Sequence, residues 1–169
     1  MRVAGVVLVT ALALALQTTV AQFAPRAGAV DLVLVAVVYA ALVAGPTTGL
    51  LSGTFAGLLQ DALSSGVVGI GGLAKTVVGF AAGVAGTQFI LTQAVPRFVV
   101  FCAASVLHSV IFIGTYEGLG LRDFGKPYAA VALEAAANAV VGVAAFKLAE
   151  VLPRAIERRR SQGPRVRRR

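Results

Sequence analysis

The sequence predicts an all-α integral membrane protein that folds as a bundle of six transmembrane helices. Apolar residues make up 58% of its 169 residues and charged residues 13%, whereas about a quarter of the residues in a typical globular domain are charged. The mean hydropathy is +0.88. The apolar residues also fall into six runs, most of them close to the length of about 20 residues that a helix needs to cross a hydrocarbon core. Together these observations exclude an ordinary soluble domain.

Prolines, glycines and charged residues mark the limits of the six helices. Pro25 and Arg26 separate the first helix from the second, and Gly45 and Pro46 separate the second from the third. Pro127 suits the first position of the sixth helix, where its missing N–H is not needed. The predicted helices cover residues 3–23, 29–44, 47–63, 73–89, 98–116 and 127–152.

The first helix has an alternative interpretation as a cleaved signal peptide. Arg2 provides a weakly basic start, and residues 19–21 resemble a cleavage site. The apolar run is long for the central region of a signal peptide. We therefore expect an uncleaved transmembrane helix.

The charge is concentrated at the C-terminus, so we divide the chain into a transmembrane domain, residues 1–153, and a basic tail, residues 154–169. The tail holds eight arginines and one acid, Glu157. Arginines near a membrane favour the cytoplasmic side, and six crossings place the two ends of the chain on the same side, so we expect both termini in the cytoplasm. Arginines at the membrane surface also bind anionic lipids, so we expect the tail to bind lipid and not nucleic acid. The arginines assigned to lipid binding and topology are Arg158, Arg159, Arg160, Arg167, Arg168 and Arg169.

Glycines recur at every fourth position in the third and fourth helices, so within each helix they share one face. Inside a bilayer, small residues at this spacing let two helix backbones approach closely. We therefore expect these helices to form a tight antiparallel hairpin. The glycines that define the two helix-packing seams are Gly49, Gly53, Gly57, Gly79 and Gly83.

One charged residue extends each seam toward the turn between the two helices. Asp61 follows Gly57 by four residues, and Lys75 precedes Gly79 by four. Intramembrane charges usually face protein and find partners, which favours an Asp61–Lys75 ion pair. The alternative is that Asp61 caps its helix end and Lys75 extends to the lipid headgroups. The sequence leaves both interpretations open.

Four further polar residues within the apolar runs are candidates for a specific role. Asp31 lies in the first turn of the second helix, where a carboxylate accepts hydrogen bonds from free backbone N–H groups. Glu134 and Asn138 share one face of the sixth helix, and either bond to neighbouring helices or form the polar wall of a ligand cavity. His108, in the fifth helix, is expected to be a neutral, hydrogen-bonded packing residue.

The sequence lacks the motifs of common catalytic and metal sites. It has no GxxxxGK[ST] phosphate loop, no HExxH pair, no serine elbow and no paired cysteines. One histidine and one cysteine cannot form the usual cluster of metal ligands. We therefore expect a protein that is not an enzyme and that needs no metal or cofactor.

Two consecutive stretches, AVDLVLVAVVYAALVAGPTTGLLSGTFAGLLQDALSSG and VVGIGGLAKTVVGFAAG, resemble the MreD family of bacterial rod shape-determining membrane proteins. In that family an Asp opens the second helix, a glycine-rich third helix ends in an LLxD-like motif, and a GLxxLAK-like stretch follows. Asp31, Asp61 and Lys75 occupy these places. The resemblance covers residues 31–86, and Val30 stands where the family often has proline.

The resemblance implies a non-catalytic component of the cell-elongation machinery in the bacterial cytoplasmic membrane. Its expected partner is MreC, and through MreC it would connect to MreB, to RodA and to the penicillin-binding transpeptidase of RodA. The family is also similar to the six-helix S components of energy-coupling-factor vitamin transporters. A small-molecule-binding transport subunit or permease therefore stays open as an alternative.

Overall fold

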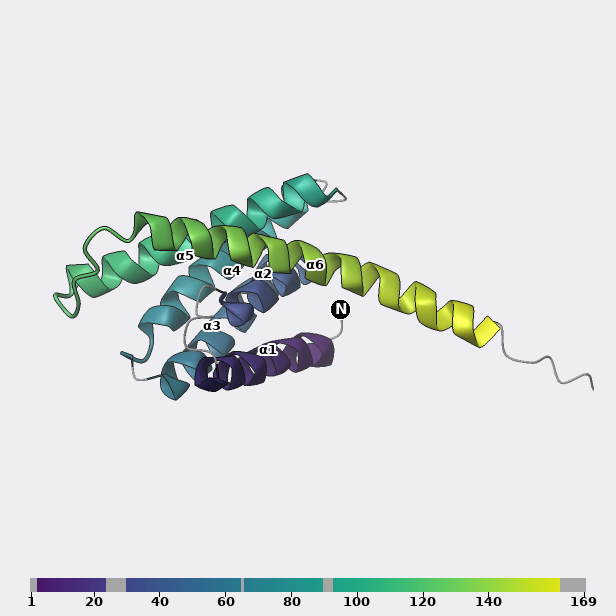
Figure 1. Cartoon of the computed structure of the whole chain (residues 1–169), viewed down its shortest axis with the longest axis horizontal. Helices are drawn as coiled ribbons and strands as arrows, with labels where there is room; N and C mark the ends of the chain where they lie inside the picture. Colours follow the sequence, from purple (N-terminus) through teal and green to yellow (C-terminus); the bar gives the residue numbers. More distant parts are fainter. Residues whose placement is uncertain (1–2, 24–29, 65, 90–92, 162–169) are drawn as a thin grey trace, which may run out of the picture.

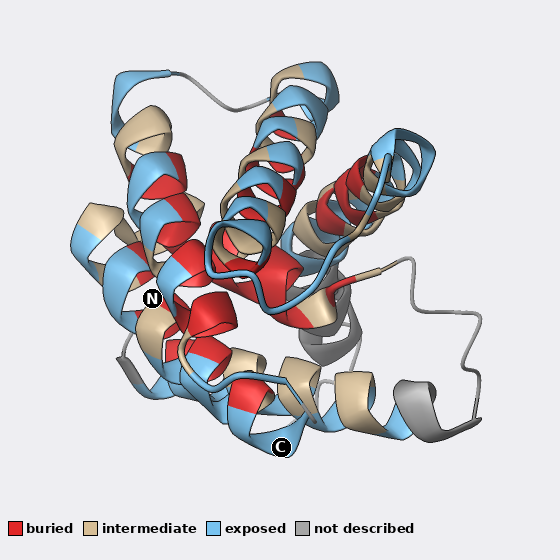
Figure 2. Ribbon diagram, turned by 90° about the vertical axis from the view of Figure 1, so that its left-hand side faces the viewer, coloured by how far each residue is buried: buried red, intermediate tan, exposed pale blue. Residues whose placement is uncertain are grey.

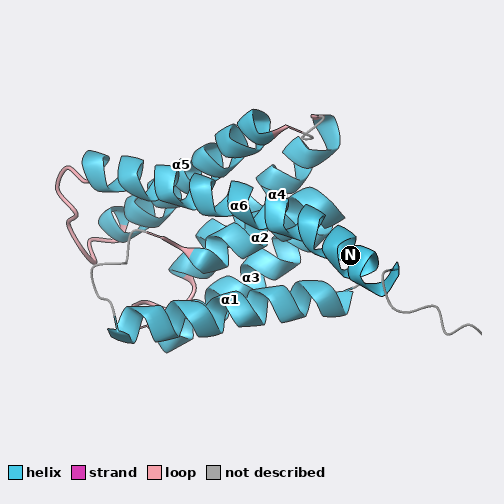
Figure 3. Cartoon of the chain, turned by 45° about the vertical axis from the view of Figure 1, so that its right-hand side comes forward, coloured by secondary structure: helices cyan, strands magenta, loops and turns pink. Residues whose placement is uncertain are grey.

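The computed structural model describes residues 3–23, 30–64, 66–89 and 93–161. These residues form six α-helices and no strand, which confirms the all-α fold class (Figure 3). The helix boundaries agree with the predicted ones to within a few residues, except at the end of the last helix. The helices are α1 (Val3–Phe23), α2 (Leu32–Ala44), α3 (Pro46–Leu63), α4 (Ile70–Gln88), α5 (Ala94–Gly118) and α6 (Tyr128–Ser161).

Three of the helices are long and apolar enough to cross a membrane: α4, α5, and α6 as far as Val151. Among the described residues, α1 and α2 contain shorter apolar stretches, Ala4–Thr19 and Leu32–Ala44. Length and composition therefore support an integral membrane protein. The count of six crossings stays a prediction for α1, α2 and α3.

The core of the bundle is built around α2. This helix is apolar on all sides, which is typical of a helix buried among others, and it contacts every other helix. Its residues Leu34 and Val38 pack with Val78 of α4 and Phe101 of α5, each about 1% exposed. Figure 2 shows the buried residues gathered on the inward faces of the helices.

The glycine seams of α3 and α4 lie at the contact between these two helices. A Cβ atom added to Gly53 would meet the backbone carbonyl of Lys75, and one added to Gly57 would lie 2.6 Å from the Cα of Gly72. Gly49 and Gly79 face each other in the same way. The two backbones are thus in direct contact, so the interface has no room for a side chain at these positions.

The last helix extends farther than the sequence indicates. We expected it to end at Leu152, before Pro153, but α6 continues to Ser161 and projects beyond the other helices (Figure 1). Proline removes one helical hydrogen bond, and the arginine-rich segment that follows has good intrinsic helix propensity. Three of the arginines assigned to lipid binding, residues 158–160, therefore lie on the last turns of α6, although the structure does not describe their side chains. The other three, residues 167–169, lie outside the described residues.

Candidate functional site

The candidate site is a buried ion pair at the first turn of α2. The Asp31 carboxylate accepts a hydrogen bond from the Leu34 N–H at 2.9 Å, so it caps α2 as its position indicates. Its other oxygen lies 2.7 Å from the Lys75 ammonium of α4, and the two side chains are 11% and 4% exposed. The charge partner of Lys75 is therefore Asp31, and the interpretation that pairs Lys75 with Asp61 is wrong.

Asp61 instead holds the beginning of α4. Its Oδ2 atom accepts from the backbone N–H of Gly69 at 2.9 Å and of Gly72 at 3.0 Å. The first N–H groups of a helix have no partner within the helix and form its positive end, so a carboxylate is stabilised there. Asp61 thus caps the helix that follows it rather than the end of its own helix.

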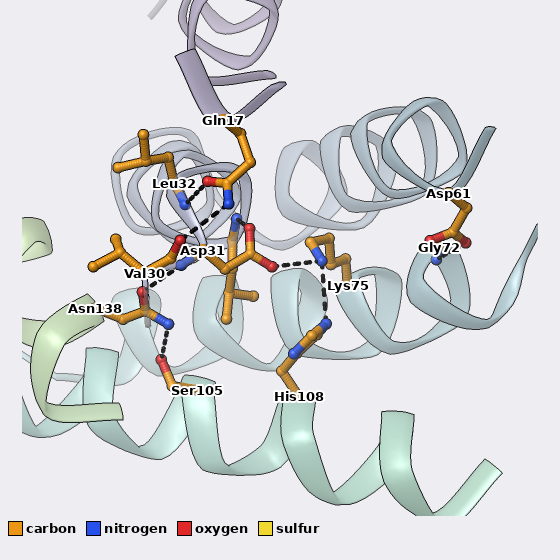
Figure 4. Close-up of polar contacts among 11 residues, drawn as sticks. Gln17, Val30, Asp31, Leu32, Asp61, Gly72, Lys75, Ser105, His108 and Asn138 are labelled. Atoms are coloured by element: carbon orange, nitrogen blue, oxygen red, sulfur yellow. Dashed lines mark hydrogen bonds and ion pairs between the residues drawn. The ribbon is translucent and has the colours of Figure 1, made fainter. Parts of the chain in front are cut away.

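The Lys75 ammonium also reaches the single histidine of the chain. Its Nζ lies 3.1 Å from Nε2 of His108, which is buried on α5. An ammonium group can only donate, so Nε2 accepts and the ring proton resides on Nδ1. The network therefore extends from α2 through α4 to α5 (Figure 4). The sequence predicts a hydrogen-bonded packing residue at His108, but its position gives no sign that the hydrogen-bond partner is the charged Lys75.

Amide side chains hold the start of α2 from two further helices. Asn138 of α6 is fully buried; its oxygen accepts from the Asp31 N–H at 2.8 Å and its nitrogen donates to Ser105 at 3.1 Å. Gln17 of α1 accepts from the Leu32 N–H at 2.8 Å and donates to the carbonyl of Val30 at 3.1 Å. Figure 4 shows these side chains converging on the start of α2. The sequence analysis did not single out Gln17 or Ser105.

Glu134 lies one helical turn before Asn138, as their spacing predicts, and is half-buried. Its carboxyl group lies beside Ser109 of α5, so it is a further polar group between α6 and α5 next to the network.

A cavity of about 290 Å³ lies next to the ion pair. Asp31, Lys75 and His108 form its buried floor, and the α3–α4 connection and the α5–α6 loop form its rim. At the rim, the Tyr116 hydroxyl accepts from the Val67 N–H at 3.0 Å. The lining residues are Asp31, Gln60, Asp61, Ser64, Gly66, Gly71, Lys75, His108, Phe112, Tyr116, Arg122 and Phe124.

The geometry of the site is that of a structural network. Each charged group of the floor is held by an opposite charge or by backbone N–H groups. Removing one partner from a buried ion pair is strongly destabilising, by about 3–5 kcal/mol, because the other charge is left uncompensated. Within the described residues, no group of three or more His, Cys, Asp or Glu side chains could hold a metal ion.

Comparison with known proteins identifies the family. A family model described as rod shape-determining protein MreD matches residues 1–149. The match extends beyond residues 31–86 to include α1, α5 and most of α6. No curated relative and no solved structure matches the chain. Because the match covers most of its length, the chain belongs to the MreD family of rod shape-determining membrane proteins.

Proposed function

We propose that this protein is the non-catalytic scaffold subunit of the bacterial cell-elongation machinery. In this role it binds MreC in the cytoplasmic membrane and helps to position or regulate peptidoglycan synthesis. Through MreC it connects indirectly to MreB, to RodA and to the penicillin-binding transpeptidase. The family match over residues 1–149 supports the role in rod shape. MreC binding is the specific step that we add.

The observation that best supports a scaffold is the network around Asp31. It ties together side chains from α1, α4, α5 and α6 at the first turn of α2. Apart from Nδ1 of His108, the buried donors and acceptors of these side chains have partners within the bundle. A bundle fixed in this way presents an unchanging outer surface to partner helices.

A variant that opens the network tests the proposal. In cells depleted of the native protein, we expect the wild-type chain to restore rod shape and to co-purify with MreC. Lys75→Met should lose both, because the Asp31 charge is left buried and alone. Lys147→Met, the same change at an exposed position of α6, is the matched control and should keep both. A wild-type chain that restores rod shape without binding MreC would refute the scaffold role.

We also propose that both termini lie in the cytoplasm, with anionic lipids bound by the basic tail. The eight arginines of residues 154–169 support this orientation, because basic residues beside membrane spans remain predominantly cytoplasmic. Reporter fusions at Arg2 and Arg169 should both give cytoplasmic signals. A periplasmic signal at Arg2 alone would mean an odd number of crossings.

The cavity supports a second candidate function, that of a small-molecule-binding subunit of a transporter. Such a role needs a pocket with a few convergent polar groups, and the floor of the cavity provides them. Gene neighbourhood separates the two candidates. Neighbouring genes for MreC and a transpeptidase favour the scaffold, whereas a neighbouring transport ATPase favours the binding subunit.

A further inference from the structure

Two buried polar atoms beside the cavity have no partner among the described residues. They are Oε1 of Gln60, on α3, and Nδ1 of His108, on α5. Both residues line the cavity. A buried polar atom without a hydrogen bond is costly, so a bound molecule that supplies the missing partners is stabilised there. One atom accepts and the other, Nδ1–H, donates, so the molecule must be able to do both.

The charges that line the cavity balance one another. Asp31 and Asp61 contribute two negative charges, and Lys75 and Arg122 contribute two positive charges, so the net charge is zero. Asp31 is neutralised by Lys75, and Asp61 is held by the N–H groups of α4. A small anion would face two carboxylates, and a small cation would face Lys75 and Arg122. The lining therefore favours a neutral ligand.

Aromatic rings form one wall of the cavity. The Phe112 ring lies 4.8 Å from that of Tyr116 and 6.4 Å from that of Phe124, measured between centroids. The Arg122 guanidinium sits 4.9 Å over the Phe124 ring at the exposed rim. The wall thus offers apolar contact area next to polar groups, which suits a ligand with an apolar face and a polar edge.

From these features, we propose that the cavity binds a neutral, ring-sized ligand rich in hydroxyl groups, a sugar, either free in solution or as the headgroup of a glycolipid. A hydroxyl group both donates and accepts, so neighbouring hydroxyls on one ring can pair with Gln60 and His108. The apolar face of the ring then packs on the aromatic wall. The volume of about 290 Å³ is near the lower end of the roughly 300–1,000 Å³ of small-molecule pockets. This binding goes beyond the scaffold role, which does not require it.

The single histidine provides a direct probe. The protein, purified with a tag that contains no histidine, is labelled with ¹⁵N-histidine and placed in phosphatidylcholine nanodiscs, so that its imidazole signals come from His108 alone. One sample is titrated with N-acetyl-D-glucosamine, and a second series of discs contains increasing fractions of glucosyl diacylglycerol. We expect a saturable shift of the Nδ1 resonance.

Gln60→Leu tests whether the signal reports the cavity. This variant removes an unsatisfied oxygen, so the fold should persist, but one ligand hydrogen bond is lost and binding should weaken roughly 3- to 10-fold. Gln88→Leu, the same change at an exposed position of α4 outside the cavity, should bind like the wild type. Co-purification of MreC with each variant shows separately whether the scaffold role persists.

The outcomes distinguish the sources of the ligand. Saturation by the glycolipid alone assigns a membrane headgroup, and saturation by the free sugar assigns a soluble ligand. The proposal is overturned if neither sugar shifts the resonance, or if Gln60→Leu binds as tightly as the wild type. A further sample is titrated with inorganic phosphate. A saturable shift with phosphate and none with sugar would show that the cavity binds an anion and not a neutral ligand.

Discussion

The α3–α4 seam and the network at the start of α2 hold the bundle together by opposite means. At the seam, side chains are absent: Gly53 and Gly57 of α3 lie against the backbone of α4. At the network, charged and amide side chains from several helices meet around Asp31. The seam therefore tolerates no added atoms, whereas the network tolerates no lost polar group.

Enlarging the seam should have the largest effect. Gly53→Leu places a side chain where the Lys75 carbonyl already lies. A backbone carbonyl cannot move aside as a flexible side chain can, so α3 and α4 must separate. This separation is costly, because the α3–α4 contact is the most extensive between any two helices of the bundle. We expect little folded protein in detergent extracts, as measured by size-exclusion chromatography.

The matched control for this change is Gly114→Leu on α5. Gly114 is exposed, and an added Cβ atom there has no neighbour within 4 Å. This variant should elute as the wild type does. Equal yields of folded protein for the two variants would mean that the seam is not a tight contact.

Opening the ion pair should have the next largest effect. Lys75→Met leaves the buried Asp31 carboxylate without its cation, and we expect the free energy of unfolding to fall by about 3–5 kcal/mol. Adding Asp31→Asn to Lys75→Met should recover part of the loss, because an asparagine still caps α2 and carries no charge. The free energy of unfolding of each variant in this double-mutant cycle is measured by titration with a denaturing detergent.

The same cycle with Asp61 distinguishes the two carboxylates. Asp61 caps α4 and is not the ion-pair partner of Lys75, so Asp61→Asn and Lys75→Met should have nearly additive effects. Strong coupling in the Asp61 cycle, with additivity in the Asp31 cycle, would contradict the observed pairing.

Removing the amide of Asn138 should have a moderate effect. Asn138→Leu keeps the volume but leaves the Asp31 N–H and the Ser105 hydroxyl without this partner. We expect a loss of about 1–3 kcal/mol in the free energy of unfolding. Ser105→Ala breaks only one of these two bonds and should cost less, so a larger loss for Ser105→Ala would contradict the assignment of Asn138 as the link to α2.

The sequence predicted the seam because its signal is local. Glycines at every fourth position in two consecutive helices define two faces, and a short connection brings those faces together. The starts of α2 and α3 were predictable for a similar reason, since Asp31 and Pro46 mark helix starts through their own backbone chemistry. The composition alone indicated a membrane protein.

The partner of Lys75 was not predictable, because it depends on how α2 packs against the hairpin. The glycine row of α4 faces α2 as well as α3: a Cβ atom added to Gly79 would lie 3.0 Å from Val37 of α2 and would also meet Gly49 of α3. Lys75, one turn earlier on that row, therefore reaches the first turn of α2. Nothing in the spacing distinguishes the two neighbouring helices, and His108 and Gln17 join from still more distant positions.

The smallest effect is expected in the second half of α6, where an ion pair is partly open to solvent. Glu150 lies 2.7 Å from Arg97 of α5, but its side chain is 49% exposed. Ion pairs at the surface contribute roughly 0–1 kcal/mol. Water stabilises the half-exposed Glu150 carboxylate, whereas the Arg97 side chain is buried, at 11% exposed. Arg97 also stacks over the Phe146 ring at 4.4 Å, so it keeps a second contact when the pair is broken. Glu150→Gln should therefore lower the free energy of unfolding by less than about 1 kcal/mol, and added salt should abolish the difference from the wild type. A loss as large as that of Lys75→Met would show that the contact between α5 and α6 depends on this pair. The Arg97–Glu150 pair would then stabilise the bundle as strongly as the Asp31–Lys75 pair does.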